Sequence, residues 1–179
     1  MATTEAGQTT GNPSDTGARL EELAGILSSQ VDCLKRLAAV LAEEQGALVE
    51  GDVEAIRRRV EVQMSVLKEI GSLEDDRRAV VRSLEPVLGS EAVATLGALV
   101  EAAPAGHRER LAGLKAALTE AVAAVTKINK HNNMLISQSL SYIDRTLKMI
   151  AGEDPTSQVY TSTGEVKCRT GQIAMDRKM

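Results

Sequence analysis

The stretch LEELAGILSSQVDCLKRLAAVLAEEQGAL, residues 20 to 48, decides the fold of this chain. Its leucines recur every seven residues, small apolar residues fill intervening positions, and Gln45 is the only polar residue in the resulting seam. This spacing places one apolar stripe along a helix that packs against other helices at shallow angles. We therefore expect a long helix over residues 18 to 50. The seam consists of Leu20, Ala24, Leu27, Val31, Leu34, Ala38, Leu41, Gln45 and Leu48.

The overall composition favours helices throughout. The chain is 43% hydrophobic but only 1% aromatic, whereas sheets usually draw on aromatic and β-branched residues. A net charge of -4 argues against sequence-independent electrostatic binding to nucleic acid. No signal peptide and no run of ~20 apolar residues is present, so we expect neither secretion by that route nor membrane insertion. Cys33 and Cys168 form no CxxC pair, which fits a reduced cytosolic compartment.

Turn and breaker residues divide the rest of the chain. Gly51 and Asp52 predict a turn followed by a capped helix, while Pro86 and Pro104 each predict a helix end. The polar N-terminal segment holds too few apolar residues to order itself. We predict an all-α fold, an elongated antiparallel three-helix bundle resembling a coiled coil. Its predicted parts are a disordered segment at 1–17, helices at 18–50, 52–85, 90–102 and 107–151, and a flexible tail at 152–179 with a local turn at 161–165.

The stretch NKHNNMLISQSLSYI, residues 129 to 143, contains no carboxylate although 26% of the chain is charged. Asn129 and Asn132 fall inside the main apolar seam of the last helix. A buried amide without partners costs about 1–3 kcal/mol, so such residues often fix register or face a partner or water. The main seam consists of Leu111, Leu114, Leu118, Val122, Val125, Ile136, Leu140, Ile143, Leu147 and Ile150.

A second apolar stripe on the same helix recurs every seven residues and lies about a third of a turn away. One interpretation is that the helix is wedged between two neighbours in the bundle. The other is that part of this surface stays uncovered and receives a helix of another protein, where few charges are expected. The stripe consists of Ile128, Leu135, Tyr142 and Met149.

The sequence offers no candidate for catalysis, for a cofactor or for a metal. His107 and His131 lie outside any Glu-x-x-His pair, and the phosphate-binding and nucleophile motifs GxxxxGK[ST], GxGxxG and GxSxG do not occur. Cys33 is typical of a small core residue. We therefore expect a protein that binds partners and is not an enzyme.

Two segments together resemble a known family. Residues 47–81, with a helix, a Gly-Asp turn and a second helix, and residues 129–152, with a C-terminal helix, are similar to those of FlgN-type flagellar export chaperones. The segment VYTSTGEV, which includes Tyr160, follows the last helix as it does in that family. The likeness depends on order and spacing together and covers about residues 20–164.

This resemblance implies a cytoplasmic protein that serves type III secretion during assembly of the bacterial flagellum. It would bind the C-terminal helices of the hook-filament junction proteins, keep them unassembled and deliver them to the export gate. By position, the substrate role would fall on Asn132, Leu135, Tyr142 and Met149, with Ile128 in the same stripe, and gate docking on Tyr160. The N-terminal extension, the 90–102 helix and the long tail depart from the family pattern.

A self-associating structural or adaptor protein without an export role is the alternative. In that case the wide apolar surface would form the seam of a homodimer. The sequence leaves the oligomeric state open.

Overall fold

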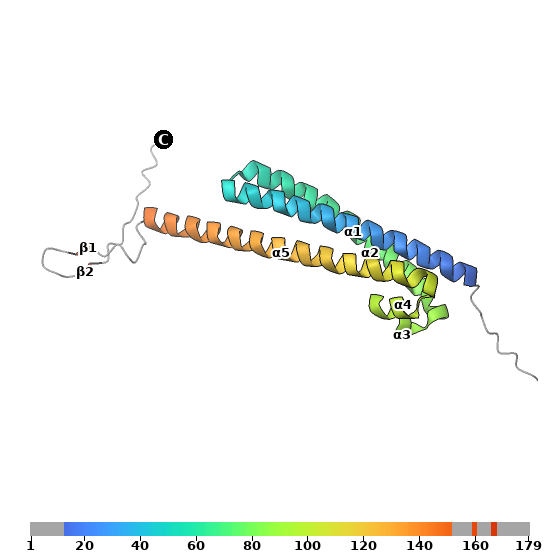
Figure 1. The fold of residues 1–179 in the computed structure, drawn as a ribbon. Helices are drawn as coiled ribbons and strands as arrows, with labels where there is room; N and C mark the ends of the chain where they lie inside the picture. The colour runs from blue at the N-terminus through green and yellow to red at the C-terminus, as the bar shows by residue number, and fades with distance from the viewer. Residues whose placement is uncertain (1–12, 152–158, 161–165, 168–179) are drawn as a thin grey trace, which may run out of the picture. The chain divides into compact units, whose positions relative to one another are not determined.

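The computed structural model describes residues 13–151, 159–160 and 166–167 (Figure 1). The chain divides into two compact units, one ending at Asn132 and the other beginning at Asn133. Helices dominate both units, so the predicted all-α class is confirmed. The elements are α1 (Pro13–Glu50), α2 (Val53–Leu88), α3 (Ser90–Val93), α4 (Leu96–Ala102), α5 (Ala105–Ile150), β1 (Val159–Tyr160) and β2 (Val166–Lys167).

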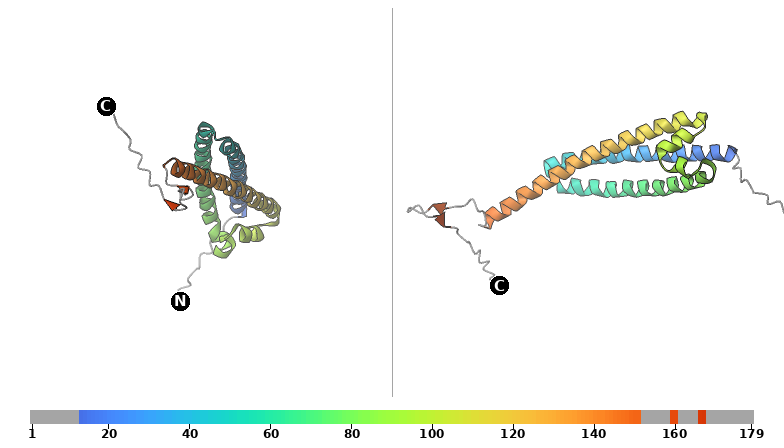
Figure 2. Two further views of the ribbon diagram at one scale, coloured as in Figure 1. Left: turned by 90° about the vertical axis from the view of Figure 1, so that its left-hand side faces the viewer. Right: turned by 90° about the horizontal axis from the view of Figure 1, so that it is seen from below.

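Helices α1 and α2 form an antiparallel hairpin, seen from three directions in Figures 1 and 2. Gly51 adopts a φ of 73°, a left-handed conformation that costs glycine little. The Asp52 carboxylate then accepts a hydrogen bond from the Ala55 amide at 2.9 Å, which caps α2. This two-residue connection fixes the register, and ion pairs such as Arg36 with Glu69 at 2.9 Å bridge the helices.

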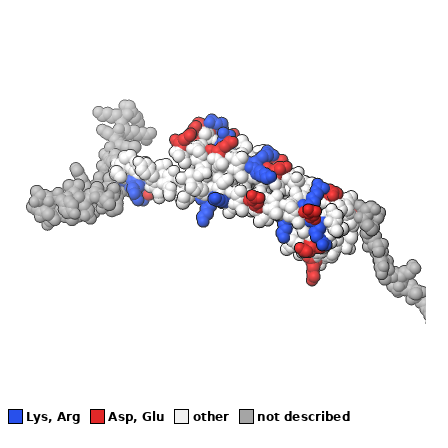
Figure 3. All heavy atoms as spheres, viewed as in Figure 1, with Lys and Arg blue, Asp and Glu red and all other residues white. Residues whose placement is uncertain are grey.

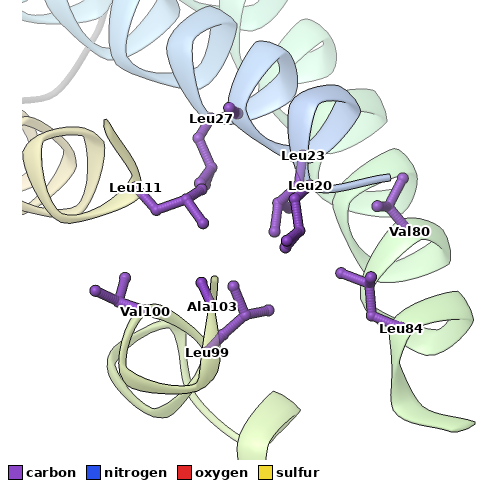
Figure 4. Close-up of a cluster of buried hydrophobic side chains, with 10 residues drawn as sticks. Leu20, Leu23, Leu27, Val80, Leu84, Leu99, Val100, Ala103 and Leu111 are labelled. Atoms are coloured by element: carbon purple, nitrogen blue, oxygen red, sulfur yellow. The ribbon is translucent and has the colours of Figure 1, made fainter. Parts of the chain in front are cut away.

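Two clusters of buried side chains hold the first unit together. The first joins the N-terminal part of α1, the C-terminal part of α2, α4 and the start of α5 (Figure 4). The second joins Cys33, Leu37 and Leu41 of α1 to Val66 of α2, with Val125 and Ile128 of α5 packed against it. Helix α5 therefore runs in the same direction as α1 within this unit. The first cluster consists of Leu20, Leu23, Ala24, Leu27, Val80, Leu84, Leu99, Val100, Ala103 and Leu111.

The buried side of α1 includes a charged residue that lies outside the predicted seam. Leu20, Leu27 and Leu41 are buried as expected, but Glu44, beside Gln45, is also buried, and Gln45 is half-buried. Glu44 is accommodated because Asn132 of α5 donates a hydrogen bond to its carboxylate at 3.0 Å. A polar residue can thus occupy the interior when a partner on another helix satisfies it.

Several helix ends also differ from the prediction. Helix α1 begins at Pro13, since proline suits the first helical position. Helix α2 continues through Pro86 to Leu88 because Leu84 and Leu88 pack in the first cluster and hold its last turn. The predicted single helix at 90–102 is two helices, α3 and α4, because Thr95 caps a new helix by accepting from the Ala98 amide at 3.0 Å. Helix α5 begins at Ala105, directly after Pro104.

The second unit contains the distal part of α5, from Asn133 to Ile150, and a short antiparallel pair, β1 and β2. In that pair Val159 lies opposite Lys167 and Tyr160 opposite Val166. The two strands flank the predicted turn at 161–165. That turn, the predicted disorder of residues 1–12 and the predicted flexibility of the remaining tail lie outside the described residues.

Candidate partner-binding helix

The proximal part of α5, residues 105–132, is held by α1. Leu111 is 1% exposed within the first cluster, and Leu114 and Leu118 pack partly against it. At the first turns of α5, Arg110 forms an ion pair with the Glu21 carboxylate of α1, and the Nδ1 atom of His107 lies 3.1 Å from the same carboxylate. This half of the helix is thus fixed by apolar burial together with polar contacts at its first turns.

Asn132 is the last residue of α5 that belongs to the first unit. Its side chain is 1% exposed, and its Nδ2 atom donates to the Leu41 carbonyl oxygen at 2.8 Å and to the Glu44 carboxylate at 3.0 Å. Its Oδ1 atom is buried and has no hydrogen-bond partner. Because a buried amide is stabilised by such bonds and penalised without them, these contacts set the register between α5 and α1.

The distal part of α5 carries large apolar side chains that are exposed. Tyr142 is 74% exposed and Met149 is 58% exposed. The main seam predicted for the core is exposed as well, from Ile136 at 36% to Ile150 at 70%. This departs from the prediction for the seam. Of its apolar members only Leu111 is buried, while Leu114, Leu118 and Val125 are half-buried and Val122 is 47% exposed. Asn129, predicted inside the same seam, is also exposed. The reason is that periodicity identifies which side of a helix is apolar but not what covers it.

The six predicted partner-binding residues fall in different environments. Ile128 packs against the second cluster and Asn132 is buried, so both are engaged by the protein's own helices. Leu135 is half-buried, and Tyr142 and Met149 are exposed. Tyr160 lies in β1, and its side chain is outside the described part of the structure.

Sequence reasoning missed five distal seam residues as candidates for binding, although it had placed them on one face. The signal that could have identified them is the coincidence of two apolar stripes with a near-absence of charge. Such a surface is wider than the single apolar stripe that a helix needs in order to pack in a bundle. The missed residues are Ile136, Leu140, Ile143, Leu147 and Ile150.

The first unit also contains a cavity of about 480 Å³ with a carboxylate at its wall. Glu74 accepts hydrogen bonds from Arg77 at 2.7 and 2.8 Å, from Arg78 at 2.9 Å and from Gln30 at 3.3 Å. The Arg77 guanidinium is the main cause that lowers the pKa of Glu74 to about 2. Apolar residues of α1, α2, α4 and α5 supply most of the remaining wall, including Leu27, Ile70, Leu99 and Leu118.

Cys33 belongs to the second cluster of buried side chains. Burial is the main cause that raises the pKa of the Cys33 thiol, and hydrogen bonding to Glu69 adds to it, which disfavours the reactive thiolate. Among residues 13–151 and the two short strands, no cluster of His, Cys, Asp or Glu could hold a metal ion. Within the same residues, no helix is long and apolar enough to cross a membrane.

Charged side chains on the first unit form mixed clusters separated by uncharged surface. Figure 3 shows Lys and Arg next to Asp and Glu on the face in view. The pairs include Arg59 with Glu43 at 3.0 Å and Arg57 with Glu54 at 3.1 Å. Exposed pairs of this kind contribute little stability, roughly 0–1 kcal/mol each, so this surface is a solvated exterior.

A comparison with protein families identifies the chain. Residues 19–167 match the model of the FlgN protein family, a span that includes all of α2 to α5, nearly all of α1, and both short strands. No curated protein and no solved structure matches it. Because the match covers most of the chain, the protein belongs to the FlgN family of flagellar export chaperones.

Proposed function

We propose that this protein is a cytoplasmic chaperone that binds the C-terminal helices of hook-filament junction proteins through the distal part of α5. It keeps them unassembled and delivers them to the flagellar export gate. The observation that carries the proposal is the exposure of Tyr142 and Met149, at 74% and 58%, on the distal part of α5, where residues 133–143 contain no Asp, Glu, Lys or Arg. Interfaces between proteins are depleted of charge in their cores and enriched in Tyr and Met.

Binding would proceed by apolar burial without chemistry. An amphipathic substrate helix laid along α5 would bury apolar surface at roughly 25 cal/mol per Å², less the cost of ordering both partners. Occupying the substrate helix in this way would prevent its premature pairing with other copies. A chaperone must also release its substrate, which favours an exposed site of moderate affinity.

The substitution Tyr142→Asp tests the site. We expect it to weaken binding of a junction-protein C-terminal peptide by tenfold or more in isothermal titration calorimetry. The reason is that the charged aspartate carboxylate would be buried in the interface without a partner. Ser141→Asp is the matched control, since it adds the same group at the neighbouring exposed position on the polar side of the helix. Equal affinities of the two variants would refute the proposed site.

Tyr160 is proposed to act separately, in docking on the export gate. Tyr160→Ala should leave the affinity for the junction-protein peptide unchanged and should weaken co-purification with the gate protein. A loss of peptide binding would show instead that β1 belongs to the substrate site.

Self-association is the second candidate function, and the same exposed surface favours it. Light scattering on the free chain separates the two. A dimer that Tyr142→Asp converts to a monomer would identify the surface as a homodimer seam, whereas a monomer leaves it available for a substrate.

A further inference from the structure

The distal part of α5 carries two apolar seams with the same spacing, one residue apart. In each, positions alternate by four and three residues, the pattern that packs one helix along another. Seam A contains Ile136, Leu140, Ile143, Leu147 and Ile150. Seam B contains Leu135, Ser139, Tyr142, Thr146 and Met149.

The polar members of seam B do not interrupt it. The Thr146 hydroxyl donates to the Tyr142 carbonyl oxygen at 2.9 Å, so its hydrogen-bonding need is met within the helix. Ser139 is small and adds little bulk between Leu135 and Tyr142. Seam B can therefore receive the side chains of a helix laid along it.

The combined width of the seams exceeds what one helix covers. At about 100° per residue, the two seams together occupy about 180° of the helix perimeter. A stripe of about 100° is enough for a helix that packs on one partner. Each seam has large exposed side chains near its end, with Leu147 at 60% and Met149 at 58%, although Leu135 at the start of seam B is half-buried. At these positions neither seam is covered by the described helices of this chain. Two partner helices are needed to cover this surface.

Charge distinguishes the two seams. From Lys127 to Ile150, α5 carries four bases and a single acid. That acid, Asp144, pairs with Lys148 at 2.7 Å. Arg145 follows on the side of the helix that borders seam B and forms no ion pair with any residue that the structure describes. A helix on seam B would therefore be favoured by carboxylates that face Arg145.

We propose, resting on the proposed function, that the export substrate supplies two helices to the distal part of α5, and that the helix on seam B is acidic. The substrate would thus be held as a helical pair around α5, which completes a small three-helix core. A single substrate helix would leave one seam exposed to water.

The experiment measures binding of a full-length hook-filament junction protein to the full chain with one seam altered at a time. Leu147→Asp alters seam A and Met149→Asp alters seam B, at sites of nearly equal exposure. We expect each to weaken binding by tenfold or more, while Ser141→Asp changes it by less than about twofold. Circular dichroism should show unchanged helix content, since all three sites are exposed.

The outcomes separate this inference from the proposed function. Loss of binding in Met149→Asp alone would mean that one helix binds, which overturns the inference and leaves the function standing. Unchanged binding in both seam variants would overturn the function as well. A free dimer that Leu147→Asp dissociates would assign seam A to a second copy of this chain and would also overturn the inference.

The acidic character of the seam B helix has its own test. Arg145→Glu should weaken binding roughly three- to tenfold at low ionic strength, and the difference from Arg145→Lys should shrink at about 0.5 M salt as charges are screened. Equal affinity of Arg145→Glu and Arg145→Lys at low salt would refute an acidic partner.

Discussion

The two parts of α5 share one sequence pattern and differ in what surrounds it. Residues 105–132 and residues 133–150 both carry apolar residues at spacings of three and four. Leu111 in the proximal part is 1% exposed, while Leu140 in the distal part is 61% exposed. A helical pattern thus specifies an apolar face, and the availability of neighbouring helices decides whether that face is buried or stays exposed.

Truncating one leucine in each part should reveal the largest difference. Leu111→Ala should lower the free energy of unfolding by about 2–5 kcal/mol, because it opens a cavity in the first cluster. Leu140→Ala removes the same atoms from an exposed site and should change it by less than about 0.5 kcal/mol. Urea unfolding followed by circular dichroism measures both. Equal losses would show that the distal seam is also buried in the free protein.

The boundary between the parts can be tested at adjacent asparagines. Asn132→Ala should cost about 1–3 kcal/mol of unfolding free energy, because it leaves the buried Glu44 carboxylate without its donor. Asn133→Ala, at the exposed neighbouring position, should cost less than about 0.5 kcal/mol. Hydrogen exchange should also show faster opening of the α5 turns around residue 132 in the first variant. A stability like that of Asn133→Ala would mean that the Asn132 contacts do not hold α5 to α1.

Much of the first unit followed from local sequence signals. The leucine repeat of α1 predicted a helix with a buried stripe, and the all-α class followed from it together with the scarcity of aromatics. The burial of Asn132 was predicted from its place in the seam, but the burial of Gln30 and Glu44 was not, because the partners that satisfy them are remote in sequence. Gln30 meets Glu74 of α2, and Glu44 meets Asn132 of α5.

The candidate site was predicted only in part. Tyr142 and Met149 belonged to the stripe singled out for partner binding, and they are exposed. Ile128 and Asn132 belonged to the same prediction and are engaged within the bundle. A repeat of seven continues unchanged across the boundary at residue 132, so only tertiary packing could divide it.

Acid should weaken the first unit through Glu74, the smallest effect expected here. Arginine contacts lower the pKa of the Glu74 carboxyl from its ordinary value of 4.5 to about 2 in the folded chain. Because the pKa of Glu74 is lower in the folded chain, its ionised carboxylate stabilises the fold fully above about pH 4.5. This contribution is lost as the pH falls toward 2 and the carboxylate becomes protonated. Because Glu74 is partly exposed, we expect its contribution to be about 1–2 kcal/mol.

Glu74→Gln separates this effect from general acid unfolding. Near neutral pH the variant should unfold at lower urea than the unsubstituted chain, and the gap should close between about pH 4.5 and pH 2, where the native carboxyl becomes protonated. Asp75→Gln is the matched control, because Asp75 is an exposed neighbour on the same helix. A gap that is independent of pH would show that Glu74 acts through packing and neutral hydrogen bonds.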